Sequence, residues 1–144
     1  MPKRKPSDTR YTNTDFDLKS HLPFESLRDE LAASCTLLNY TFGDDGNWHS
    51  IVESSNPDEV HGDHRTASMD IRLILNALIR LSDQARSELN NCYMREFNIG
   101  FDCWDTWSYL HSLPCDIVRD IADLSCTLAV TLYPMRDPDG KPKD

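Results

Sequence analysis

The sequence lacks an apolar run of the roughly 18 to 20 residues that cross a bilayer. Its basic N-terminal residues 1–10 are also followed by no apolar segment. We therefore expect neither a membrane span nor membrane binding, and we predict a cytosolic protein. The 144 residues, 39% of them hydrophobic, suit a single domain that buries about two thirds of the surface of its unfolded chain.

Glycine is scarce, and the five glycines form neither a GxGxxG nor a GxxxxGK loop. Both loops bind phosphates through backbone N–H groups, so we expect no nucleotide or other cofactor. Basic residues are scattered apart from Lys3, Arg4 and Lys5, and no aromatic residue is interleaved with these three. This pattern argues against nucleic acid as a partner.

Cysteine is present in an odd number, without a CxxC pair. The five are Cys35, Cys92, Cys103, Cys115 and Cys126. This arrangement does not build a disulfide framework. We interpret the cysteines as small core residues of a protein from a reducing compartment.

Residues 41–64 contain no lysine or arginine. The chain as a whole has a formal net charge of −9. The acidic residues of this segment are Asp44, Asp45, Glu53, Asp58, Glu59 and Asp63. Such a field repels phosphate backbones and speeds the encounter with a basic partner. The alternative is that the charge serves solubility alone.

Two segments 91 residues apart are similar, Leu22–Tyr40 and Leu113–Thr131. Aligned without a gap they share eight of nineteen residues, where random pairing would give about one. Each follows a short alternating run, at residues 15–20 and 106–112. We therefore predict a repeated unit of strand, Leu-Pro turn, helix and strand.

Hydrophobic periodicity predicts the remaining elements. Strands are expected at residues 15–20, 35–42, 47–53, 92–104, 106–112 and 126–133. Helices are expected after Pro23, from Thr66 or Ser68 to about Leu89, and from Pro114 to Leu124. Residues 54–65 form an irregular acidic excursion. Residues 1–13 and 135–144 are expected to be tails of a single domain at residues 14–134.

The predicted order is β-α-β-β-α-β-β-α-β. Crossovers between parallel strands are right-handed, so the helices are expected on one face of a mixed sheet. The fold class is therefore α+β, a ferredoxin-like sheet with an added β-α-β arm.

A resemblance to a known group rests on three runs of the sequence. They are DFDLKSHLPFESLRDELA (15–32), NWHSIVES (47–54) and REFNIGFDCWDTWSYLHSLPCDIVRDIADLSCTLAVTLYP (95–134). Together they resemble small bacterial α+β domains of unknown function found among polymorphic-toxin immunity proteins. The resemblance spans most of residues 14–134 and brings no catalytic residue. It implies a bacterial binding module whose partner it does not identify.

A metal site would have to use His49, His61 and His64 with Asp63. Zinc needs three or four converging ligands, which an HxxH pair in a loop does not guarantee, so a solvated loop is the alternative. Cys115 at a helix start, with His111 four residues earlier, is a candidate nucleophile. Because Phe24 occupies the equivalent repeat position, we instead expect an apolar position there.

Aromatic and acidic residues alternate between residues 102 and 109. Asp102, Trp104, Asp105, Trp107 and Tyr109 would form a contact surface for a basic protein if their rings lie on the face away from the helices. Alternatively, the rings cover the edge of the core.

These observations predict a non-enzymatic, acidic protein-binding module, an immunity-type inhibitor that covers a basic partner such as a toxin. The expected partner-binding residues are Asp44, Asp45, Trp48, Glu53, Asp58, Glu59, Asp63, Asp102, Trp104, Asp105, Trp107 and Tyr109. One alternative is a self-associating module, such as a homodimer formed through the open sheet face. The other is a metal- or thiol-dependent enzyme.

Overall fold

The computed structural model describes residues 9–54, 65–104, 108–137 and 139–141. Within these ranges the elements are β1 (Arg10–Ser20), α1 (Glu25–Ala32), β2 (Cys35–Phe42), β3 (Trp48–Ser54), α2 (Ala67–Ile79), α3 (Asp83–Asn91), β4 (Met94–Cys103), α4 (Cys115–Asp123) and β5 (Thr127–Pro134). The chain is therefore α+β, as predicted. No helix in the described ranges combines the length and apolar content needed to cross a bilayer.

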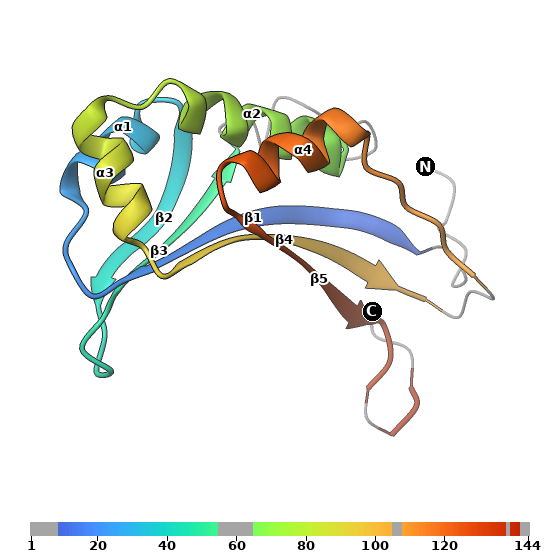
Figure 1. Cartoon of the computed structure of the whole chain (residues 1–144). Coiled ribbons are helices and arrows are strands. Elements are labelled where there is room, and N and C mark those ends of the chain that lie inside the picture. Colours follow the sequence, from blue (N-terminus) through green and yellow to red (C-terminus); the bar gives the residue numbers. More distant parts are fainter. Residues whose placement is uncertain (1–8, 55–64, 105–107, 138, 142–144) are drawn as a thin grey trace.

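The strands form one mixed sheet in the order β2-β3-β1-β4-β5. Neighbouring strands are antiparallel except β4 and β5, which are parallel. All four helices lie on one face of the sheet, and the sheet arches beneath them (Figure 1). The opposite face is concave and has no element of the described chain across it. We call it the open face.

Alternation along β1 explains this two-layer arrangement. Phe16 and Leu18 are fully buried under the helices, whereas Asp15 and Asp17 between them point to the open face and are half-buried. Phe16 packs on Phe97 of β4 with ring centroids 4.6 Å apart. Leucine and isoleucine side chains of α1, α2, α3 and α4 complete the core from above. A single core therefore joins every helix to the central strands.

The first helix begins after the Leu-Pro turn, as expected, and no side chain of its own turn caps it. Instead Glu88 of α3 accepts a hydrogen bond from the Leu27 N–H of α1 at 3.0 Å. In return Glu30 of α1 accepts hydrogen bonds from the N–H and hydroxyl of Ser82, the N-cap of α3. The two helices thus cap each other's N-termini.

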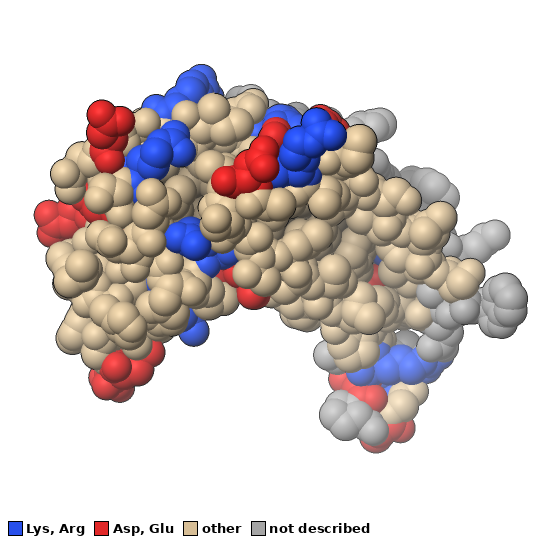
Figure 2. All heavy atoms as spheres, viewed as in Figure 1, with Lys and Arg blue, Asp and Glu red and all other residues tan. Residues whose placement is uncertain are grey.

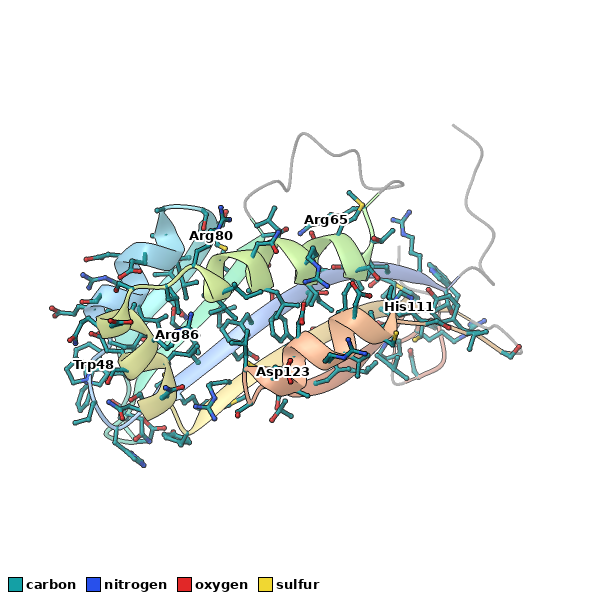
Figure 3. The ribbon with its side chains drawn as sticks, turned by 45° about the horizontal axis from the view of Figure 1, so that its top comes forward. Trp48, Arg65, Arg80, Arg86, His111 and Asp123 are labelled. Carbon is teal, nitrogen blue, oxygen red and sulfur yellow. The ribbon has the colours of Figure 1, made fainter. Side chains whose placement is uncertain are left out.

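The helix predicted from residue 66 to 89 is two helices. Thr66 caps α2 as expected, but Ser82 caps a second helix by accepting from the Ala85 N–H at 3.2 Å. Arg86 donates to the carbonyls of Leu78 and Ile79 and so closes the end of α2. Figure 3 shows Arg80 and Arg86 at this junction. The predicted apolar stripe is nevertheless buried along both helices.

Two strand predictions are corrected. β1 starts at Arg10 and not at residue 15, because it pairs with β4 up to the Arg10–Asp102 position. The predicted strand at residues 106–112 is wrong for the described residues 108–112, which form no strand. There Tyr109 and His111 pack their rings on Phe101 instead of extending the sheet. In the described residues 108–112, the second copy of the repeat therefore has no leading strand.

A buried charged network ties α2 to the sheet. Asp70 is 4% exposed and accepts hydrogen bonds from the Arg65 Nε at 2.8 and 2.9 Å, from the Ser54 hydroxyl at 2.6 Å and from the Tyr11 hydroxyl. Figure 3 shows Arg65 beside α2. Burial alone would lower the pKa of Arg65, but the hydrogen bond and charge of Asp70 outweigh it and raise that pKa. The network joins β1, β3 and α2.

We predict that Asp70→Asn lowers the free energy of unfolding by about 3–5 kcal/mol, because it leaves the Arg65 charge buried without its counterion. Urea unfolding followed by circular dichroism measures the loss. The matched control is Asp120→Asn, which removes the partly exposed 2.6 Å pair with Arg72 and should cost about 1 kcal/mol or less. Equal losses in the two variants would contradict a stabilising role for the buried network.

Candidate functional site

Carboxylates on three adjacent strands gather on the open face. We define the acidic face as Asp15 and Asp17 of β1, Glu53 of β3, and Glu96 and Asp102 of β4. Asp17 stands directly opposite Glu96 in the sheet, and Phe16 pairs with Val52, which brings Glu53 beside Asp15. All five side chains belong to half-buried residues. Strand pairing, which fixes the spacing of side chains, therefore holds these like charges close together.

Asp15 is the carboxylate most affected by this crowding. Burial, a hydrogen bond with Glu53 and the negative charges of Glu53 and Asp17 raise the pKa of Asp15 to about 7. The Asn13 amide lies between the pair, 3.3 Å from Asp15 Oδ1 and 3.4 Å from Glu53 Oε1. A neutral amide donor only partly compensates two carboxylates. At neutral pH Asp15 therefore holds a proton part of the time.

Asp17 is also a carboxylate whose neighbouring negative charge is only partly compensated. Burial and the neighbouring charge of Glu96 raise the pKa of Asp17, and Lys19 opposes them only in part. Among the described residues no group donates a hydrogen bond to the buried Asp17 Oδ1. An unpaired buried acceptor costs free energy, so Asp17 is held in this position at a cost to stability.

A hollow of about 400 Å³ adjoins Asp17 on this face. Its lining side chains include Asp17, Lys19, Asn39, His49, Ile51 and Met94. The lining is mixed, with an apolar floor between polar groups. This hollow can accept the stem of a long side chain whose charged end reaches Asp17.

The predicted acidic segment contributes to the acidic face only in part. Asp44 and Asp45 lie in the exposed turn between β2 and β3, and Glu53 belongs to the acidic face. Hydrogen bonds from His49, 3.1 Å away, and from Asn47 lower the pKa of Asp45 to about 2. Asp58, Glu59 and Asp63 fall outside the described residues.

The structure places the predicted aromatic contact residues in different surroundings. Trp48 stacks on Tyr40 at 5.0 Å and packs against the core at the end where α1 and α3 lie (Figure 3). Tyr109 is exposed but packs on Phe101 and on His111, which belong to the helix side of the sheet. Trp104 is half-buried. Asp105 and Trp107 fall outside the described residues, and Asp102 of this predicted cluster lies on the open face.

The described residues give little support to the alternative of a metal- or thiol-dependent enzyme. His49 pairs with Asp45, while His61, His64 and Asp63 fall outside the description. The described chain contains no group of three or more His, Cys, Asp or Glu residues arranged to hold a metal ion. Cys115 opens α4 and is exposed, whereas Phe24 is buried. The apolar position expected for Cys115 from the repeat is therefore wrong.

The four cysteines other than Cys115 are buried or partly buried. All five cysteines are free, and Cys35 and Cys92 are buried. Burial raises the pKa of Cys92 to about 12 and that of Cys126 to about 11. A raised pKa lowers the fraction of thiolate, which is the reactive form. The interpretation of these residues as inert core thiols fits Cys35 and Cys92 best.

Compared with protein-family models, curated proteins and solved structures, the chain matches none of them. The function of the acidic face must therefore be argued from its geometry and charge.

We predict that Asp15→Asn raises the melting temperature at pH 8 by about 2–4 °C, the shift that about 1 kcal/mol produces in a domain of this size. A carboxyl with a raised folded-state pKa binds its proton more tightly in the folded protein, so stability falls as pH rises from about 4 to 7. The variant removes this loss and flattens the profile. Thermal unfolding between pH 4 and 8 measures it.

The control for this experiment is Asp44→Asn, which removes the same charge from the exposed turn. It should leave the slope of the stability profile unchanged between pH 4 and 7. An Asp15→Asn profile parallel to that of the wild type would show that the crowding of carboxylates on the acidic face does not affect stability.

We predict one fast-reacting thiol in the native protein. Cys115 is exposed, so it should react with a disulfide reagent at least about 100-fold faster than Cys35, Cys92 or Cys126, whose thiolate fractions are suppressed by burial. Cys115→Ser should remove the fast phase, and Cys92→Ser should retain it. A fast phase that survives Cys115→Ser would contradict the assignment.

Proposed function

We propose that this protein is a non-enzymatic protein-binding module that holds a basic partner against the acidic face. The observation that carries this proposal is the pair of Asp17 and Glu96, which stand opposite each other on the open face, with the pKa of Asp17 raised by burial and by the charge of Glu96. A lysine or arginine from a partner supplies the missing positive charge. The acidic face is thus complementary to a cation.

Partial burial makes each such contact stronger than a surface ion pair. The interaction between charges increases as the effective dielectric constant falls, and the sheet already removes part of the water around Asp15 and Asp17. A cation that binds beside Asp15 also favours its ionised form. Binding near neutral pH is therefore accompanied by release of a proton from the Asp15–Glu53 pair.

The shape of the sheet favours a convex partner. The open face is the inner side of an arch, with the β2–β3 turn at one end and the segment after β5 at the other (Figure 1). Acidic side chains also lie at the tip of the β2–β3 turn (Figure 2), where Asp44 and Asp45 are exposed. These two residues steer a basic partner toward the arch without making its final contacts.

An immunity-type inhibitor is the form of binding that we favour. The chain resembles small domains found among polymorphic-toxin immunity proteins, and the acidic face is complementary to a convex basic surface beside an active site. If the partner is a nuclease, carboxylates on this face compete with the phosphates of its substrate. Inhibition then requires only that this chain cover the active site of its partner, and this chain catalyses no reaction.

We also propose that residues 10–103 form a ferredoxin-like core. In support, β4, β1, β3 and β2 are neighbours in this order and all pairs are antiparallel. α4 and β5 then extend the core on the β4 side. Support for an internal repeat comes from the helix, turn and edge strand that each copy forms, α1–β2 at one edge and α4–β5 at the other.

To test the acidic face, we suggest immobilising the protein, capturing binders from a lysate of its host and identifying them by mass spectrometry. Binding of the identified protein is then measured with a triple variant, Asp15→Asn, Asp17→Asn and Glu96→Gln. We expect its affinity to fall by about 10- to 100-fold, because the ion pairs at the centre of the interface are lost.

The matched control is Asp44→Asn, Asp45→Asn and Asp123→Asn, which removes three charges away from the acidic face. It should slow association modestly and leave the dissociation rate unchanged. Calorimetry of the wild type in buffers of different ionisation enthalpy should detect the released proton. Equal loss of affinity in the two triple variants, or capture of acidic proteins only, would rule out binding at the acidic face.

A further inference from the structure

Before its last residue, Pro134, the edge strand β5 has no charge, proline or bulge to prevent it from pairing with another chain. Its residues 127–133 contain no charged residue and no proline, and its pairing with β4 runs without a register shift. The opposite edge strand, β2, does have a register shift, between Leu37 and Asn39. The Asn39 side chain there also accepts from the Ile51 N–H at 2.9 Å. Bulges protect edges, so only β5 is left open to pairing.

An apolar groove lies beside β5 on the helix side of the sheet. Leu128, Val130 and Leu132 stand opposite the buried Phe97, Ile99 and Phe101 of β4, yet they are 41%, 58% and 60% exposed. Val118 of α4, 46% exposed, and Tyr109 complete a groove of about 430 Å³. His111 also lines the groove, and Figure 3 places it near the start of α4.

The charges of α4 lie away from this groove. Asp116 and Asp120 pair with Arg72 of α2 at 2.9 and 2.6 Å. The flank of α4 toward β5 instead presents Val118 and, one turn later, Ala122. The groove is therefore uncharged, in a chain whose formal net charge is −9.

On the helix side of the sheet, the apolar pattern of β5 is symmetric about Val130, because Leu128 and Leu132 lie two residues to either side of it. We propose that β5 pairs antiparallel with β5 of a second copy across a two-fold axis at Val130, joining two sheets into one. This register sets Val130 opposite its own copy and Leu128 opposite Leu132 of the other chain. A two-fold interface needs a self-complementary surface, which the Leu-Val-Leu pattern supplies on the helix side. Pro134 lies just beyond the paired residues.

The contact area predicts a reversible dimer. A contact limited to one edge strand and its groove is smaller than the roughly 800 Å² per partner of a standard interface. Backbone hydrogen bonds between the two strands further stabilise this contact. The two acidic chains repel each other, so added salt strengthens the dimer by screening them.

This dimer goes beyond the proposed function and is compatible with it. The acidic face is on the opposite side of the sheet from the groove. Each copy can therefore bind its own basic partner, and that binding weakens with salt while the dimer becomes stronger.

Sedimentation velocity of the wild type across a range of micromolar concentrations tests the proposal. We expect a monomer–dimer equilibrium whose dissociation constant decreases as NaCl rises from about 50 to about 500 mM. Val130→Lys places two like charges at the two-fold axis and should raise the constant at least about 100-fold. The control Leu38→Lys changes an exposed leucine on the other edge strand, and should leave the constant unchanged.

Cross-linking tests the register. In a Cys115→Ser background, Val130→Cys should form a covalent dimer on oxidation, because opposed residues of antiparallel strands have Cβ atoms about 4.5–5.5 Å apart. Leu38→Cys in the same background should not. A wild type that stays monomeric throughout, or a dimer that Val130→Lys leaves intact or that Leu38→Lys also breaks, would overturn the proposal. A monomeric wild type would leave the groove to a strand of another protein.

Discussion

The structure depends on a sheet that is covered on one face only. β1 lies near the middle of this sheet, and its alternating side chains meet two different surroundings: Phe16 and Leu18 meet the helices, and Asp15 and Asp17 meet solvent. Shifting this strand by one residue would bury two carboxylates and expose the core. The hydrophobic effect thus fixes the register of β1, and the fixed register in turn holds the carboxylates of β1, β3 and β4 together.

This arrangement accounts for the charge properties of the open face. The free energy released by burying the apolar side of β1 outweighs the repulsion on its polar side. As a result, a row of crowded carboxylates persists in the folded protein with raised pKa values at Asp15 and Asp17. Local destabilisation of this kind is common where a surface is adapted to a ligand.

The fold could be predicted from the sequence in segments where apolar residues recur with one constant spacing. The strand at residues 35–42 and the helix after Pro114 are confirmed almost to the residue, since their apolar side chains recur with one spacing. The break at Ser82 was missed because the apolar stripe continues across it from Leu78 to Ala85. The strand prediction is wrong for the described residues 108–112, because alternation alone does not reveal whether a partner strand has an open edge.

The candidate site was harder to predict, because it is made by pairing between distant segments. Asp15 and Asp17 were visible in the sequence as the polar half of an alternating strand. Their neighbours Glu53 and Glu96 are 36 or more residues away along the chain, and only the strand order brings them together. Net charge pointed instead to residues 41–64, of which the described part supplies only Glu53 to the acidic face.

The exchange of caps between α1 and α3 has a consequence for motion. Glu30 closes the start of α3 and Glu88 closes the start of α1, so fraying of either helix removes a hydrogen-bond acceptor from the other. We expect the two helices to open and close together as one cooperative unit. Amide protons of these two short helices then share one free energy of opening.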